Sequence, residues 1–227
     1  MIMTTFCTCI ESGLFVLKGG MLMHDHQKEL HVVSTNQQSA ERLIQTIVSI
    51  HPYVDAIHIR EKRWTARKIS KIVKYLYQKN VPREKIIIND RVDVATALRT
   101  GGAHLATHSL DVSLVKEAFP TLKVGCSVHA VKEAINAQEK GADYCIYGHI
   151  FPTTSKPNLS PRGLEQLHSL IEAVNIPVIA IGGITADNVS TVLQTGAHGV
   201  AVMSGVFLSD DPKEAIFNIR KSMKGQR

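Results

Sequence analysis

Ser127 and His129 follow an apolar run at residues 123–126, and they are the first candidates for chemistry. An imidazole titrates near neutral pH and can both accept and donate a proton, so His129 is the candidate general acid and base. The alternative is a histidine with a structural role only. No Ser-His-Asp or Cys-His arrangement accompanies these residues, which disfavours covalent nucleophilic catalysis.

Arg60 and Lys62 are candidates for binding an anion. They lie two positions apart at the end of the apolar run that begins at residue 56, so both side chains can point to the same side. Either cation can hold a carboxylate or a phosphate. The alternative is that they form structural ion pairs with Glu61 or Asp90.

A polar loop after the run Tyr144–Tyr147 offers a second set of anion-binding groups. Thr153, Ser155 and Lys156 supply two hydroxyls and one ammonium group. The stretch up to Gly163 is long for a connection and could close over a substrate. The alternative is a solvated loop.

Small residues end the last two apolar runs of the chain. Gly182 and Gly183 end one run, and Met203, Ser204 and Gly205 end the next. Backbone N–H groups at such positions can approach an anion closely, helped by the N-terminus of a following helix. We therefore expect Gly183, Met203 and Ser204 to bind phosphate; the alternative is tight-turn packing alone.

These polar residues belong to a regular alternation of short apolar runs with longer amphipathic segments. The expected strands are Leu30–Val33, Ala56–Arg60, Ile86–Asn89, Ala103–Ala106, Lys123–Cys126, Tyr144–Tyr147, Val178–Ile181 and Gly199–Met203. The expected helices are Ser39–Ser49, Ala66–Gln78, Val92–Thr100, Ser113–Ala118, Val131–Glu139, Pro161–Val174, Ala186–Gln194 and Pro212–Met223. Continuously apolar strands favour a parallel sheet buried on both faces. Eight strand–helix units predict an α/β protein with a (β/α)8 TIM barrel, whose carboxyl-end face would gather the polar residues; a doubly wound open sheet is the alternative.

The composition narrows the class of partner. The 227 residues are 44% hydrophobic and 20% charged, which excludes disorder as the main state. The net charge of +6 raises the expectation of an anionic partner. No block of like charges, no helix-turn-helix and no apolar run of membrane-spanning length occur, so we expect no nucleic-acid and no membrane partner. Four cysteines without a CxxC pair favour a cytoplasmic location, and the oligomeric state stays open, a homo-oligomer included.

Residues 1–26 do not share the alternating pattern. We expect a disordered or non-native leader there and a single barrel domain at residues 27–227. His24 and His26 lie in this leader without a third ligand, so no metal site and no cofactor are expected.

Several motifs extend the argument from residue types to a family. They are HIREK (58–62), INDRVDVA (88–95), GCSVHA (125–130), GADYCIYGHIFPTTSK (141–156), IPVIAIGGIT (176–185) and GVAVMSGVF (199–207). With these motifs in this order, the chain from about Glu29 to Met223 resembles the thiamine-phosphate synthase/TenI superfamily of (β/α)8 barrels.

That superfamily has two branches. The synthases join an aminopyrimidine diphosphate to a thiazole phosphate, and the resemblance to them implies Mg²⁺ at Asp90. It also implies diphosphate contacts at residues that are all present here, namely Arg60, Lys62, Asn89, Ser127 and Lys156. The chain departs from the synthase pattern at Ser109, where the second Mg²⁺-binding Asp is absent, at His149, which replaces a proline, and at His58, which replaces a glutamine.

These departures resemble the TenI branch, the thiazole tautomerases. The resemblance implies that His129 is the general acid/base that converts a dihydrothiazole carboxylate phosphate into its aromatic isomer, without a metal. We therefore expect an isomerase of thiamine biosynthesis whose partner is that small molecule. Thiamine-phosphate synthase, favoured by Asn89 and Asp90, is the alternative, and a non-catalytic regulatory relative is a third.

Overall fold

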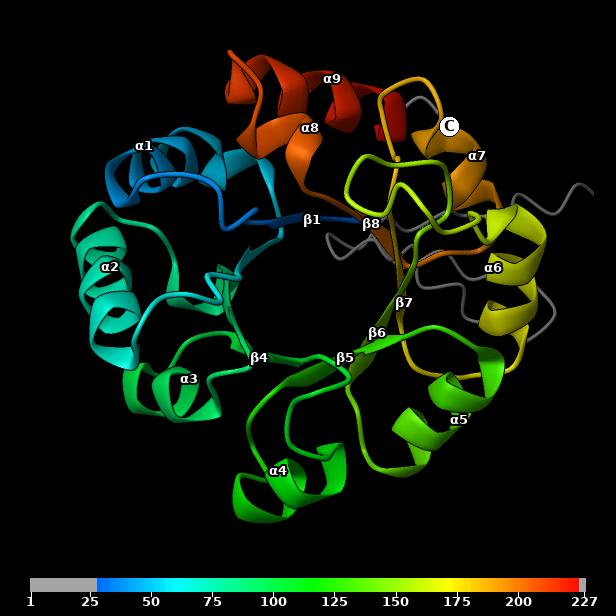
Figure 1. The fold of residues 1–227 in the computed structure, drawn as a ribbon, viewed down its shortest axis with the longest axis horizontal. Helices are drawn as coiled ribbons and strands as arrows, with labels where there is room; N and C mark the ends of the chain where they lie inside the picture. Colours follow the sequence, from blue (N-terminus) through cyan, green and yellow to red (C-terminus); the bar gives the residue numbers. More distant parts are fainter. Residues whose placement is uncertain (1–27, 225–227) are drawn as a thin grey trace, which may run out of the picture.

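Eight parallel strands close into a barrel in the computed structural model, which describes residues 28–224 (Figure 1). The strands are β1 (Glu29–Val33), β2 (Ala56–Ile59), β3 (Ile86–Asn89), β4 (Gly102–Leu105), β5 (Val124–Val128), β6 (Tyr144–Gly148), β7 (Val178–Ile181) and β8 (Gly199–Val202). Each strand pairs with its neighbours in sequence, and β8 closes the barrel against β1 with Val202 opposite Val32. The predicted (β/α)8 barrel is confirmed.

Helices surround this barrel in the order of the sequence (Figure 1). They are α1 (Ala40–Ile50), α2 (Ala66–Gln78), α3 (Val92–Leu98), α4 (Val112–Ala118), α5 (Val131–Glu139), α6 (Gly163–Glu172), α7 (Val189–Gln194), α8 (Ser204–Phe207) and α9 (Pro212–Lys224), with 3-10 turns at His51–Tyr53 and Arg83–Lys85. Side-chain caps mark several of the starts, two of them through hydroxyl groups. The hydroxyl of Ser39 accepts the N–H of Arg42, and that of Thr65 accepts the N–H of Lys68.

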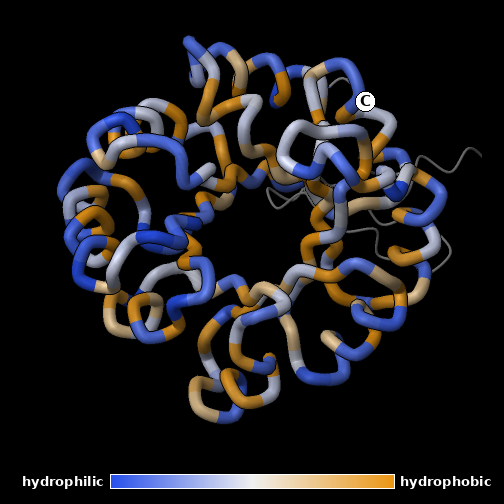
Figure 2. The backbone as a smooth tube through the Cα atoms, in the orientation of Figure 1, coloured by the Kyte–Doolittle hydropathy of each residue, from blue (hydrophilic) through white to orange (hydrophobic). Residues whose placement is uncertain are grey.

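The main hydrophobic core lies between the strands and the helices. Ile57, Ile59 and Ile86 are fully buried there, together with Val73 and Leu76 of α2. Hydrophobic and hydrophilic stretches alternate along each helix, as expected for helices with one buried face (Figure 2). This layer positions the strand ends at which the site is built.

The barrel interior is partly polar, unlike the apolar strands expected from the sequence. A small core of Val33, Tyr144, Ile146, Ile179 and Ala201 fills part of it. Three buried histidines also point inward: His31, His58 and His104, which are 3%, 1% and 4% exposed. The ring of Tyr144 packs against them.

Gly125 makes room for that ring. A Cβ atom at Gly125 would lie 2.0 Å from Cζ of Tyr144, so a side chain there would displace the tyrosine. A glycine inside a strand thus marks a close approach of another residue rather than a turn.

The expected leader at residues 1–26 lies outside the described residues. Within residues 28–224, no helix is long and apolar enough to cross a membrane. Cys126 and Cys145 are buried free thiols. The short helix α8 is absent from the sequence prediction, and α6 begins at Gly163 rather than at residue 161.

Candidate active site

A cavity of about 610 Å³ lies at the carboxyl ends of the strands. It is lined by all of the predicted catalytic and substrate-binding residues: Arg60, Lys62, Asn89, Ser127, His129, Thr153, Ser155, Lys156, Gly183, Met203 and Ser204. The barrel topology therefore brings together residues that are far apart in the sequence. Residues that sequence reasoning did not select also line the cavity, among them Thr35, His58, His104 and His149.

The charge of the cavity wall is one-sided. Arg60, Lys62 and Lys156 line it, whereas no aspartate or glutamate among the described residues does. None of these three cations forms an ion pair in the described part of the chain, so the alternative of structural pairs with Glu61 or Asp90 is not realised. Such cations are free to bind an anionic ligand.

The surroundings lower the pKa of two of these groups, and neighbouring positive charge contributes for one of them, Lys156. Burial lowers the pKa of the Lys156 ammonium, and the nearby guanidinium groups of Arg162 and Arg60 lower it further. Burial also lowers the pKa of Arg60. A phosphate between Lys156 and Arg60 would relieve this repulsion, because an opposite charge favours the ionised form.

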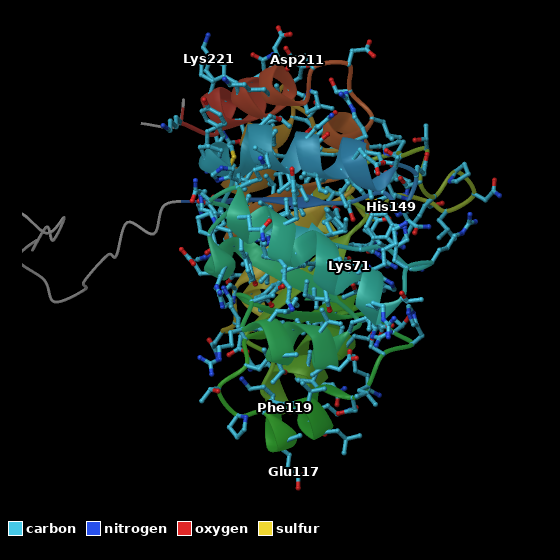
Figure 3. The ribbon with its side chains drawn as sticks, turned by 90° about the vertical axis from the view of Figure 1, so that its left-hand side faces the viewer. Lys71, Glu117, Phe119, His149, Asp211 and Lys221 are labelled. Carbon is cyan, nitrogen blue, oxygen red and sulfur yellow. The ribbon has the colours of Figure 1, made fainter. Side chains whose placement is uncertain are left out.

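The loop that carries Thr153, Ser155 and Lys156 is tied back to β6. The side chain of Arg162 donates from Nε to the carbonyl of Gly148 at 3.0 Å, and its backbone N–H donates to the carbonyl of His149 at 2.9 Å. Figure 3 labels His149 at the end of the barrel where the strands finish. These contacts hold the ends of the loop together at the cavity.

The glycine pair after β7 fits under the same loop. Gly183 has φ +67°, and a Cβ atom there would meet the carbonyl oxygen of Pro152 at 2.6 Å and Cβ of Phe151 at 2.7 Å. Its carbonyl accepts a hydrogen bond from Nδ2 of Asn188 at 2.9 Å. Glycine is required here by the backbone conformation and by the loop, so tight-turn packing accounts for part of its presence.

The end of β5 supplies two side chains with different partners. Oγ of Ser127 lies 2.9 Å from Nε2 of His104, a buried histidine whose pKa desolvation lowers to about 3, so that its imidazole is neutral near pH 7. Nδ1 of His129 is buried and has no hydrogen-bond partner within residues 28–224. His129 also lines the cavity, so its ring can contact a ligand there.

The residues do not form a ready-made Mg²⁺ site. Asp90 does not line the cavity, and its carboxylate lies 4.0 Å from Nε2 of His108. Oγ of Ser109 accepts the backbone N–H of Ala106 at 2.8 Å. No group of three or more His, Cys, Asp or Glu side chains suited to a metal occurs among the described residues. Asp90 alone would bind a hard cation weakly, because such a cation is coordinated by several oxygen ligands.

Fold and site together define a (β/α)8 barrel with a cationic pocket at its catalytic face. Residues 30–206 match the family model TMP-TENI, described as thiamine monophosphate synthase, and the chain belongs to this family.

Curated and solved relatives agree with that assignment. The chain is 40% identical over 167 residues to a thiamine-phosphate synthase of Pyrococcus furiosus, covering 73% of this chain and 81% of the relative. It is 35% identical over 196 residues to one of Clostridium botulinum, covering 84% and 96%. A solved thiamine phosphate pyrophosphorylase from Pyrococcus furiosus has a TM-score of 0.76 at 35% identity, covering 88% of this chain and 96% of that one. A 3-hexulose-6-phosphate synthase with a TM-score of 0.67 and 17% identity shares the fold.

These relatives contradict the expectation of a thiazole tautomerase. They are named as synthases, which are transferases, so the predicted isomerase activity and its thiazole carboxylate substrate are wrong. The prediction depended on departures at Ser109, His149 and His58, a small number of positions in a match of 167 residues.

Proposed function

We propose that this protein is a thiamine-phosphate synthase, which joins an aminopyrimidine diphosphate to a thiazole phosphate and releases pyrophosphate. One observation carries the proposal: within residues 28–224, three cations without an ion-pair partner and no carboxylate line the cavity, in a chain that is 40% identical to a synthase of this name. Both substrates are anionic. When the C–O bond to the diphosphate breaks, the oxygen that leaves with pyrophosphate gains additional negative charge.

Arg60, Lys62 and Lys156 are proposed to hold the diphosphate. In the reaction, the lone pair of the thiazole nitrogen forms the new C–N bond at the methylene carbon of the pyrimidine. The C–O bond to the diphosphate breaks, and its electron pair leaves with pyrophosphate. Cations that are already in place stabilise this developing charge better than mobile water does. Asn89 and Ser127, which also line the cavity, are proposed to add polar contacts.

The phosphate of the thiazole is proposed to bind at Gly183, Met203 and Ser204. Their strands, β7 and β8, are neighbours in the barrel, and loops after these strands commonly bind phosphate in this fold. Anchoring this phosphate orients the ring nitrogen toward the methylene carbon. Such positioning lowers the entropic part of the barrier.

His129 is proposed to donate a hydrogen bond or proton to the departing pyrophosphate. It lines the cavity beside Ser127, which is one of the proposed diphosphate contacts. A general acid at this point makes the leaving group less basic. Thr153 and Ser155 of the loop are proposed to close the cavity over both substrates.

Incubation with both substrates, with and without Mg²⁺, tests the proposal. Thiamine phosphate and pyrophosphate should appear in equal amounts by mass spectrometry and a pyrophosphate assay, and neither substrate alone should yield the product. Absence of coupled product with the folded protein, both substrates in excess and Mg²⁺ present would overturn the proposal.

A further inference from the structure

A row of histidines leads from the cavity toward the amino end of the barrel. His58 and His104 line the cavity, whereas His31 lies deeper, since it pairs in register with Ala56, two residues before His58. The ring centroids of His31 and His58 are 5.2 Å apart. The proposed synthase reaction assigns no step to His31 or His58.

A hydrogen-bonded chain links this row to a carboxylate. Nε2 of His31 lies 2.8 Å from Oε2 of Glu29, and Nδ1 of His31 lies 3.1 Å from Nε2 of His58. Glu29 is the first residue of β1, and its other oxygen, Oε1, lies 3.5 Å from Nε2 of His198. The chain thus runs from Glu29 through His31 to His58.

The carboxylate determines the direction of every hydrogen bond in this chain. Hydrogen bonds from His198 and His31 hold the pKa of Glu29 far below its usual value, so the group is ionised at neutral pH and can only accept. Nε2 of His31 must therefore carry a hydrogen. In a neutral His31 ring, Nδ1 is then the acceptor, and His58 must donate to it from Nε2. This leaves Nδ1 of His58 with a free lone pair.

We infer that Glu29, His31 and His58 form a proton relay that makes Nδ1 of His58 a proton-accepting atom at the floor of the cavity. A proton taken up at Nδ1 of His58 releases the hydrogen on Nε2 of the same ring to Nδ1 of His31. His58 is neutral again, in its other tautomer, and the positive charge resides on His31 against the Glu29 carboxylate. The reverse transfer returns the proton to the cavity.

The surroundings explain why a relay is required. Burial lowers the pKa of His58 well below its usual value. Positive charge on His31, His104 or Lys123 acts in the same direction, and the Glu29 carboxylate opposes it. A positive charge that stayed on His58 would therefore be unfavourable. Moved to His31, it lies next to a carboxylate. The titratable groups that face His58 are His31 and Glu29 of β1, His104 of β4, Lys123 before β5 and Tyr144 of β6.

An uncharged acceptor in an otherwise cationic cavity suits a ligand group that donates an N–H hydrogen bond. The amino group of an aromatic heterocycle is of this chemical class. Only this choice of ligand rests on the proposed function. The relay itself belongs to the protein and exists without substrate.

Histidine tautomers can be read directly in the ligand-free protein. In ¹⁵N-histidine-labelled protein, long-range ¹H–¹⁵N correlation spectra distinguish Nδ1–H from Nε2–H rings, and the single variants His31→Gln and His58→Gln assign the two signals. Both rings should be Nε2–H tautomers near pH 7.5. An Nδ1–H ring at His58 would overturn the relay.

Glu29→Gln tests whether the Glu29 carboxylate determines the tautomers of His31 and His58. An amide can donate as well as accept, and replacing an orienting carboxylate in this way releases the wrong histidine tautomer in catalytic triads. The Nε2–H population of His31 and His58 should fall in this variant. The matched control is His198→Gln, which removes the other histidine at Glu29 and should leave both tautomers unchanged. Unchanged tautomers in folded Glu29→Gln would show that the carboxylate does not set the relay. Because no substrate is used, the result is independent of the coupling assay.

Discussion

Replacing Lys156 by methionine should separate activity from stability. The ammonium group lines the cavity, and burial and the nearby Arg162 and Arg60 lower its pKa. In the free protein it therefore adds repulsion, which a bound diphosphate removes. Methionine retains most of the aliphatic length, so packing of the loop changes little. Lys156→Met should lower activity without lowering the free energy of unfolding.

The expected loss follows from the contact that disappears. A hydrogen bond to a charged group contributes about 1.5–3 kcal/mol. This corresponds to a fall in kcat/KM of roughly 10- to 150-fold, since each 1.36 kcal/mol is a factor of ten. Steady-state kinetics with the aminopyrimidine diphosphate varied and the thiazole phosphate saturating measures it, and urea denaturation measures stability.

The matched control is Lys71→Met on α2, an exposed lysine on a surrounding helix that does not line the cavity (Figure 3). Its kinetics should stay within two-fold of the wild type, roughly the limit for a distant surface charge. Unchanged kcat/KM in Lys156→Met would remove Lys156 from the diphosphate site. A clear loss of unfolding free energy would show instead that the ammonium stabilises the loop, which contradicts the repulsion argument.

Three other substitutions test different parts of the molecule. His129→Gln should lower kcat by about 10²–10⁴-fold with an unchanged melting temperature, and a loss of only a few-fold would exclude proton donation. Gly183→Val should raise KM for the thiazole phosphate and also lower the melting temperature, because the valine Cβ would collide with Pro152 and Phe151. Gly183→Ala should do both to a smaller extent. A valine variant with unchanged KM would refute the proposal that Gly183 helps to bind the phosphate. Asp111→Asn should keep the cap of α4 but lose the ion pair with Lys140, which lies 2.5 Å away. Hydrogen bonds from Lys140 and, to a smaller extent, Ser113 lower the pKa of Asp111 to about 2. The stability that the ionised carboxylate adds is therefore present above about pH 4 and is lost as the pH falls toward 2. The melting temperatures of variant and wild type should converge over that range, and a difference that persists at pH 2 would contradict the assignment.

Much of the fold follows from local sequence features. The sequence predicts helix α2 to the residue, because apolar positions recur at helical spacing, and the structure adds that Thr65 caps its start. Helix α8 has only four residues, too few to show a period, and it was missed. The site residues were found for a topological reason: once eight strand–helix units predict a barrel, the carboxyl ends of all strands must lie on one face.

The histidine chain could not be predicted in the same way. Glu29 and His31 are neighbours on one face of β1, which alternation does predict. The contact of His31 with His58 depends on the stagger between β1 and β2, which opposes Ala56 to His31 and which no local pattern encodes. The assignment to the tautomerase branch failed for a different reason. It gave weight to three positions, Ser109, His149 and His58, whereas relatives that match over 167 and 196 residues are named synthases.

The polar barrel interior is better explained by function than by stability. Three buried imidazoles must be desolvated, and a hydrogen bond between neutral groups contributes only about 0.5–1.5 kcal/mol in return. Valine or leucine at these positions would fill the same volume without that cost. Moreover, Nδ1 of His104 and Oη of Tyr144 are buried without a partner in the described part of the chain. Groups that lower stability at the floor of a cationic cavity are typical of a site that handles protons or orients a ligand. If the histidines served packing alone, His31→Leu would stabilise the protein and leave the tautomer of His58 unchanged. The relay requires instead that any gain in stability be accompanied by a fall in the Nε2–H population of His58, because Nδ1 of His31 is the acceptor that selects this tautomer.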